Sequence, residues 1–150
     1  MRIADILKIK GSSVHMVRPT DTIETLATRL RDDNVGAMLV SEKGVVADGI
    51  ISERDVTRGL ATHGAKLLTM TVSQLMTSVV ISCAPQDGVA DVAAVMTRER
   101  IRHLPVKDRD HVVGFVSIGD IVKYRLEEMQ LETSVLRDYA AAAVLSRGVR

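Results

Sequence analysis

The sequence predicts an α+β fold in which two β-α-β-β-α repeats pack sheet to sheet, with a cleft between the repeats and a long C-terminal helix. The first observation is an internal repeat: a shift of 66 residues lays Pro19 over Pro85 and Ile23 over Val89. The second is that short apolar runs alternate with amphipathic stretches in the same order in both halves. We expect neither half to bury its sheet alone, so the halves should share an interface.

Each repeat is predicted to begin with a strand and a helix. Strands are expected at residues 14–17 and 79–82, each followed by a proline that disfavours continuation. The helix of the first repeat should begin at residues 21–24, Asp-Thr-Ile-Glu, which have the spacing of a capping box. The residues expected on the buried helix faces are Ile23, Leu26, Ala27 and Leu30 in the first repeat and Val89, Val92, Ala93 and Met96 in the second.

A hairpin and a second helix should complete each repeat. The second helices are expected to begin after Ser52 and Ser117. In both halves, two short β-rich runs flank a turn signal, which is typical of a hairpin. The predicted hairpins pair residues 37–41 with 45–51 and residues 104–106 with 112–116.

The chain is expected to have three parts. They are a first repeat with the N-terminal segment at residues 1–65, a second repeat at 66–128 and a C-terminal helical extension at 129–150. The join between the repeats lies near residues 62–70, where a turn signal interrupts the periodicity.

The C-terminal stretch carries an apolar stripe of heptad type and is longer than one repeat needs. Such a stripe packs either on its own domain or on a second chain. We expect a homodimer, because an apolar stripe that overhangs its domain needs a partner to leave water. The members recur at spacings of four and three: Val122, Leu126, Met129, Thr133, Leu136, Ala140 and Ala143.

Composition and charge exclude several classes of function. Lys and Arg number 20 against 19 Asp and Glu, and 2% of the residues are aromatic, so we expect no nucleic-acid partner. Cys83 is the single cysteine, and neither a signal-like start nor a membrane-length apolar stretch occurs, so we expect a cytoplasmic protein without a membrane partner. The histidines lack metal-ligand spacing and no catalytic motif is present; we expect no metal site and no enzyme activity.

The pattern Gly-h-h-Ser-x-x-Asp, in which h is apolar, occurs at residues 49–55 and again at 114–120. One explanation is a helix cap, because a serine accepts a backbone N–H and an acidic residue in the first turn complements the helix dipole. The other is a ligand site, in which free N–H groups suit a phosphate and the carboxylate accepts hydrogen bonds from ribose hydroxyls. The two explanations are compatible.

A basic cluster precedes one predicted strand of the second repeat. Arg98 and Arg100 are explained by the C-terminal end of a helix, where cations complement the dipole. Arg102 and His103 flank the strand entrance and suit an anionic ligand, the first as a bidentate fork and the second as a tunable donor. The equivalent first-repeat residues are Gly36 and Ala37, so the halves are chemically unequal.

The doubled Gly-h-h-Ser-x-x-Asp motif, together with Ile-Arg-His-Leu-Pro-Val at residues 101–106, resembles a tandem pair of CBS domains, often called a Bateman module. The resemblance covers residues 5–128. It implies that an adenosine compound, such as AMP, ADP, ATP, NAD or S-adenosylmethionine, binds in the cleft between the repeats. It also implies that the module regulates another activity.

The resemblance also implies roles for individual residues. Asp55 and Asp120 would accept hydrogen bonds from ribose hydroxyls, and Arg102 and His103 would hold phosphate in the site of the second repeat, so the stronger site should depend on Asp120. The remaining implied residues are Ser52 and Ser117 beside phosphate or ribose, Arg54 as a phosphate partner, Gly36 and Ala37 as backbone contacts, and Lys10, Ser13, His15, Met76, Val79 and Ile81 on the adenine side.

Three hypotheses of function follow. The first is an adenine-nucleotide-binding regulatory module without catalysis. The second is a structural or scaffolding dimer in which the Ser-x-x-Asp motifs serve only as caps. The third is a regulatory subunit that acts in trans on an unidentified enzyme or transporter.

Overall fold

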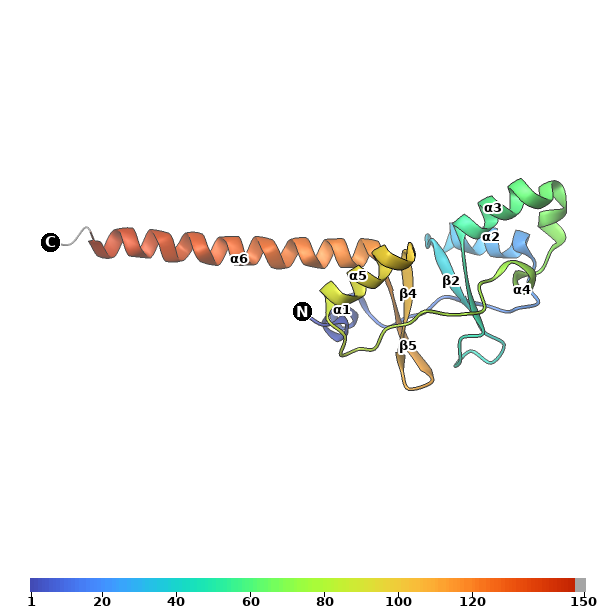
Figure 1. Cartoon of the computed structure of the whole chain (residues 1–150), viewed down its shortest axis with the longest axis horizontal. Helices are drawn as coiled ribbons and strands as arrows, with labels where there is room; N and C mark the ends of the chain where they lie inside the picture. The colour runs from blue at the N-terminus through green and yellow to red at the C-terminus, as the bar shows by residue number, and fades with distance from the viewer. Residues whose placement is uncertain (148–150) are drawn as a thin grey trace.

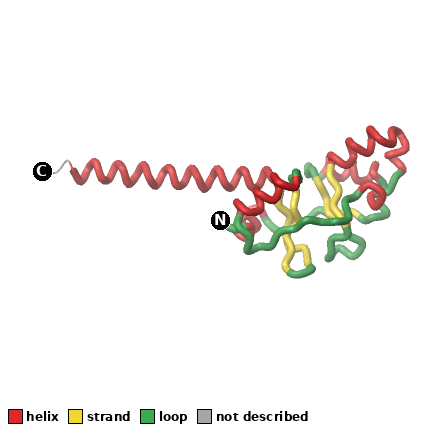
Figure 2. The backbone as a smooth tube through the Cα atoms, in the orientation of Figure 1, coloured by secondary structure: helices red, strands yellow, loops and turns green. Residues whose placement is uncertain are grey.

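The computed structural model describes residues 1–147 and contains two small sheets with helices packed beside them, from which one long helix projects (Figure 1, Figure 2). This arrangement confirms the predicted α+β class; residues 148–150 of the predicted extension lie outside the described part. The elements are α1 (Ile3–Lys10), β1 (Met16–Val17), α2 (Ile23–Asp32), β2 (Ala37–Val40), β3 (Gly49–Ser52), α3 (Glu53–His63), a 3-10 helix (Gly64–Thr69), α4 (Val72–Leu75), α5 (Val89–Glu99), β4 (His103–Asp108), β5 (His111–Ser117) and α6 (Ile118–Arg147).

The first sheet has the strand order β1-β2-β3, with β1 parallel and β3 antiparallel to β2. Its core contains Ile23, Leu26 and Leu30 of α2 as predicted, whereas Ala27, predicted on the same face, is exposed. The N-cap of α2 is Thr22, whose hydroxyl accepts the backbone N–H of Thr25 at 3.2 Å. The capping box predicted at Asp21 is therefore wrong by one residue.

The first hairpin is shorter than predicted. Strand β3 begins at Gly49 instead of residue 45, because the preceding polar groups close a loop. The Ser41 hydroxyl donates to the Val46 carbonyl at 2.6 Å, and the Glu42 backbone N–H donates to the Asp48 carboxylate at 2.7 Å. The second hairpin, β4-β5, confirms its prediction and carries a register shift between Val106 and Lys107.

The segment that joins the repeats crosses from one sheet to the other. Thr77 pairs with Ile50 at the edge of the first sheet, and Cys83 pairs with Val106 at the edge of the second. The strand predicted at residues 79–82 is absent from the described chain, since these residues span the gap between the two edges. The crossing places this segment along the space between the sheets.

Each of the two hydrophobic cores contains residues from the other side of the predicted division at residue 65. Ile3 and Ile6 of α1 are fully buried in the core of the second repeat. Leu67 and Val72, which follow the predicted join, are buried in the core of the first repeat. Backbone hydrogen bonds fix α1 there, from Ile3 N–H to the carbonyl of residue 87 at 3.0 Å and from Ala4 N–H to that of residue 85 at 2.8 Å.

Helix α6 leaves the body of the protein after its first turns. Ile121 and Tyr124 are buried, and every residue from Met129 to Arg147 is exposed. Figure 1 shows the helix extending away from both sheets, so it does not fold back on its own repeat. None of the helices within residues 1–147 combines the length and the apolar character needed to span a bilayer.

The packing of α1 predicts a large difference between two isoleucines of the same helix. Ile6→Ala should lower the free energy of unfolding by about 2–5 kcal/mol, because it leaves a cavity in the second core. Ile9→Ala, at a side chain that is 65% exposed, should change it by less than about 0.5 kcal/mol. Urea unfolding of both variants measures the difference. Equal effects would show that α1 does not belong to that core.

Candidate functional site

Both Ser-x-x-Asp motifs cap the helices that follow them. The Asp55 carboxylate accepts the backbone N–H of Ser52 at 2.8 Å and its hydroxyl at 3.0 Å, both through Oδ2. The Asp120 carboxylate accepts the backbone N–H of Ser117 at 2.9 Å, and the Ser117 hydroxyl accepts the N–H of Asp120 at 3.1 Å. The capping explanation is thus confirmed for both. Within residues 1–147, Oδ1 of Asp55 stays available to another donor.

A pocket of about 430 Å³ lies between the two repeats. This volume is within the range of roughly 300–1,000 Å³ typical of small-molecule sites. Its lining comes from two junctions, which are the start of α3 and the passage from α5 to β4. The segment at residues 77–83, which crosses from one sheet to the other, also contributes to the lining. The lining residues with polar side chains are Ser52, Arg54, Asp55, Arg58, Thr77, Glu99, Arg100, Arg102 and His103, and the others are Ala37, Ile50, Val79, Ile81 and Ile101.

The pocket combines residues that the sequence analysis assigned to different sites. Arg102 and His103 line it together with Asp55, whereas Asp120 is not among the lining residues. Arg102 and His103 also lie beside the Ser117–Asp120 cap, because His103 pairs with Ser117 in the β4–β5 register and the Arg102 carbonyl accepts the backbone N–H of Ile118 at 2.8 Å. The expected association of Arg102 and His103 with Asp120 therefore stays a prediction. The pocket adds Asp55 to them because the two junctions face each other: Arg54 Nη1 donates across the pocket to the Arg100 carbonyl at 3.2 Å.

Gly36 explains how closely the two repeats approach at this point. A Cβ added to Gly36 would lie 3.2 Å from Cε1 and Nε2 of His103. This is tighter than ordinary contact, so the absence of a side chain at Gly36 lets the His103 ring lie against the first repeat. Gly36 thus allows the two repeats to approach closely, and Ala37 lines the pocket itself.

Four arginines give the pocket an excess of positive charge. Within residues 1–147, none of Arg54, Arg58, Arg100 and Arg102 forms an ion pair with a carboxylate at 4.0 Å or less. The lining carboxylates are Asp55 and Glu99, and Glu99 is paired with Arg98, which does not line the pocket. Unpaired guanidiniums that converge on a cavity are suited to a bidentate anion such as phosphate.

Sequence reasoning missed two of these arginines. Arg58 was not singled out, although its spacing of three from Asp55 and four from Arg54 puts all three on one helix face. Arg100 was explained by the helix dipole alone. It adopts the left-handed conformation at φ 55°, as does its repeat counterpart Asn34 at φ 52°. That conformation is uncommon for arginine, and it turns the chain from α5 towards the pocket.

His103 is a half-buried donor in the lining of the pocket. Burial lowers its pKa, the neighbouring Arg102 lowers it further, and the carboxylates of Glu53 and Asp120 oppose these effects. The ring stacks on Phe115 with centroids 5.8 Å apart. It is therefore mostly neutral near pH 7 and offers one N–H to a ligand.

Asp120 is engaged by the protein's own Lys10. The Lys10 Nζ donates to Asp120 Oδ2 at 2.5 Å. Burial raises the pKa of Asp120, but the hydrogen bonds from Lys10 and Ser117 outweigh it, so the pKa lies below its ordinary value of 3.8. Lys10, predicted on the adenine side, thus pairs with Asp120, whose first-repeat equivalent Asp55 lines the pocket.

The other predicted site residues divide between the pocket and the surrounding structure. Val79 and Ile81 line the pocket. Ser13 is exposed and outside it, and His15 Nδ1 pairs with Asp33 Oδ2 at 3.2 Å elsewhere on the first repeat. Met76 packs against the first core, with its sulfur close to Gly49.

Comparison with known proteins assigns this architecture to a family. The CBS-domain profile matches residues 4–62 and 72–127, and the chain belongs to the CBS-domain family as a protein with two repeats. It is 33% identical over 110 residues to the CBS domain-containing protein YhcV of Bacillus subtilis, covering 73% of this chain and 77% of that protein. It is 32% identical over 145 residues to the mitochondrial CBS domain-containing protein CBSX3 of Arabidopsis thaliana, covering 91% and 70%.

Solved structures show the same fold. A CBS-domain protein from Agrobacterium tumefaciens superposes with a TM-score of 0.81 at 36% identity, covering 83% of this chain and 99% of that one. The CBS domain pair of protein MJ0100 superposes with a TM-score of 0.74 at 26% identity, covering 85% and 98%. That structure is a complex with 5′-methylthioadenosine and S-adenosylmethionine.

The Lys10–Asp120 contact predicts a measurable pKa change. Lys10→Met should raise the Asp120 pKa, because it removes the main group that stabilises the carboxylate. Since the folded pKa of Asp120 is depressed, its contribution to stability is present above the unfolded value of about 3.9 and is lost as pH falls through the folded value. Carboxyl carbon shifts followed by NMR during titration measure this pKa.

Lys8→Met is the matched control, since Lys8 lies on the same helix and forms no ion pair among the described residues. An unchanged Asp120 titration in Lys10→Met would contradict the contact.

Proposed function

We propose that this chain is a cytoplasmic regulatory module, without catalysis of its own, that binds an adenine nucleotide of the AMP, ATP or NAD class in the pocket between its repeats. The observation that carries the proposal is the Ser52–Asp55 cap facing Arg102 and His103 across one pocket. The MJ0100 complex supports it, because that CBS pair holds two adenosine compounds.

Each part of a nucleotide has a chemically suited partner in the pocket. The free Oδ1 of Asp55 can accept hydrogen bonds from the ribose hydroxyls. Arg54, Arg102 and the neutral His103 can donate to phosphate oxygens. Val79 and Ile81, 82% and 36% exposed, give the adenine ring an apolar surface that leaves water on binding.

The charge of the pocket favours an anionic ligand over S-adenosylmethionine. Four unpaired arginines exceed the two carboxylates of the lining, of which Glu99 is already paired. S-adenosylmethionine carries a sulfonium cation, which these arginines repel. A phosphate or polyphosphate ester neutralises them instead.

Regulation follows from the place of the pocket. A ligand that contacts both junctions favours one packing of the repeats over others, and it shifts the population by its difference in affinity. We include a homodimer in this proposal, with neither nucleic acid nor membrane as partner, and an unidentified protein as the regulated target. A purely structural dimer and a subunit that regulates an enzyme or transporter in trans are the alternatives.

The two capping aspartates provide a matched test. Asp55→Ala should weaken the binding of ATP, AMP or NAD by about ten- to a hundred-fold, because hydrogen bonds to a charged group contribute roughly 1.5–3 kcal/mol. Asp120→Ala removes an equivalent cap outside the pocket and should leave the affinity nearly unchanged. Calorimetric titration measures the dissociation constants, and melting temperatures report the loss of each cap. If none of the three nucleotides binds the unmodified protein, the structural-dimer alternative is favoured.

The arginines predict a dependence on ligand charge. ATP should bind more tightly than S-adenosylmethionine, and raised ionic strength should weaken ATP binding by screening. Arg58→Gln should weaken ATP more than adenosine, whereas Arg31→Gln, on the exposed surface of α2, should affect neither. Fluorescence competition with a labelled nucleotide gives all of these affinities. Equal weakening of ATP and adenosine in Arg58→Gln would argue against a phosphate contact.

A further inference from the structure

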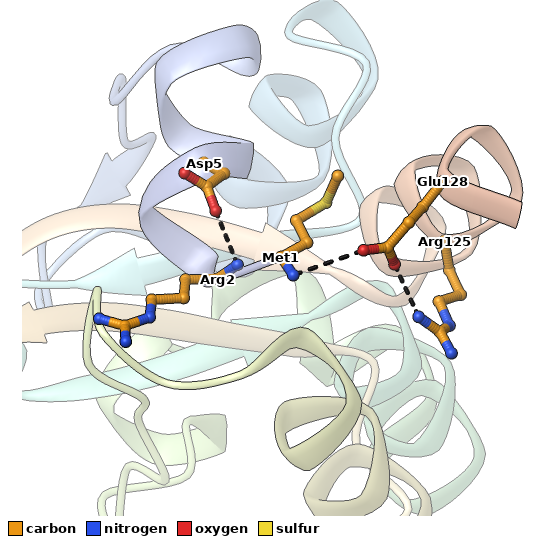
Figure 3. Close-up of polar contacts among 5 residues, drawn as sticks. All are labelled: Met1, Arg2, Asp5, Arg125 and Glu128. Atoms are coloured by element: carbon orange, nitrogen blue, oxygen red, sulfur yellow. Dashed lines mark hydrogen bonds and ion pairs between the residues drawn. The ribbon is translucent and has the colours of Figure 1, made fainter. Parts of the chain in front are cut away.

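The long helix α6 is attached to the module only over its first turns. Figure 3 shows the last of these contacts, in which the Met1 ammonium lies 3.4 Å from Glu128 Oε1 and Arg125 donates to Glu128 Oε2 at 2.6 Å. The hydrogen bond from Arg125 is the main cause that lowers the Glu128 pKa. Beyond Glu128, every described residue of α6 is exposed.

An apolar stripe runs along a side of α6 that faces away from its own module. Val122, Leu126 and Met129 are 51–53% exposed, and Leu136 is 69% exposed. At 3.6 residues per turn, this stripe lies about 120° around the helix from the buried Ile121 and Tyr124. A partner can therefore cover the stripe while each module remains on the outer side.

We propose that residues 122–143 of α6 pair in parallel and in register with the same residues of a second copy of this chain; the pairing rests on the homodimer included in the proposed function. The stripe supplies three heptads over about 33 Å of helix. Its a positions are Leu126, Thr133 and Ala140, and its d positions are Val122, Met129, Leu136 and Ala143.

Charge complementarity determines the orientation. In a parallel pair, a g residue faces the e residue of the next heptad in the partner, which brings Glu132 opposite the partner's Arg137 twice by symmetry. Neither side chain forms an ion pair within residues 1–147. In the antiparallel alternative with the same overlap, Glu132 faces Tyr139 and Arg137 faces Gln130, so no opposite charges meet.

A second apolar row on α6 is less suited to pairing. Leu131 and Val135 continue the side of the helix that carries Tyr124. Glu128 and Asp138 interrupt this row at positions that a pairing helix would bury. Burying unpaired carboxylates is costly, so the stripe with Leu126, Met129 and Leu136 is the better interface.

The parallel arrangement has a consequence for regulation. Both modules attach to the N-terminal ends of their helices, so a parallel pair holds the two nucleotide pockets at one end of the assembly. α6 begins directly at the Ser117–Asp120 cap, so the start of the paired helices is part of the second repeat.

The experiment uses single cysteines in the full-length chain. The native Cys83 is a suitable background, because it is buried and burial raises its pKa to about 11, which keeps the thiol unreactive. Under mild oxidation, Met129→Cys should form an interchain disulfide, since a d residue meets its own copy in a parallel pair in register. Glu127→Cys, at an outer position of the same turn, should not.

Mixing distinguishes the two orientations. A mixture of the separate Met129→Cys and Ala140→Cys chains should give only disulfides between identical chains. A disulfide between the two different variants identifies the antiparallel arrangement and overturns the proposal. Lack of a Met129→Cys disulfide in a protein whose mass is that of a dimer shows pairing through another surface and also overturns it.

Charge reversal provides an independent measurement. Glu132→Lys should raise the dimer dissociation constant, measured by sedimentation, by about 10-fold, because two attractions become repulsions. Combining it with Arg137→Glu should restore the original value. An unchanged constant in the single variant, or a monomer at concentrations of tens of micromolar, contradicts the pairing. The affinity for ATP, measured on the same samples, reports separately on the proposed function.

Discussion

The rest of the structure depends on one constraint: each hydrophobic core buries side chains from the other side of the division predicted at residue 65. Ile3 and Ile6 complete the core of the second repeat, and Leu67 and Val72 complete that of the first. Burying a large aliphatic side chain contributes about 1.5–3 kcal/mol, so neither core is complete without residues from beyond its own repeat. Because the chain must cross twice between the halves, the two junctions that line the pocket are held face to face.

The two repeats hold equivalent carboxylates in different electrostatic states. Lys10 neutralises Asp120 within the chain, while Asp55 faces arginines that have no carboxylate partner among residues 1–147. An unpaired excess of positive charge around a cavity is unfavourable in the empty protein and is relieved by an anion. The asymmetry between the halves therefore favours one principal site over two equal ones.

Helix α6 joins the second repeat to the stripe proposed for assembly. Its first turn contains the Ser117–Asp120 cap, its second packs Tyr124 into the core, and its remainder presents an apolar stripe to solvent. Exposed apolar area of this length is unfavourable in water, which is the physical reason to infer a second helix beside it. The absence of charge on the stripe, combined with Glu132 and Arg137 beside it, is typical of a paired helix.

The sequence by itself determined the features that depend on local spacing. These include the doubled Gly-h-h-Ser-x-x-Asp motif, the helix caps at Ser52 and Ser117, the hairpins and the long C-terminal helix, because hydrogen bonds within four residues and periodic apolar positions produce them. Only the tertiary structure decided which partners share the pocket. Arg102 and His103 line one pocket with Asp55 because the repeats face each other across the crossing segment, and nothing in the spacing of either repeat encodes that long-range arrangement.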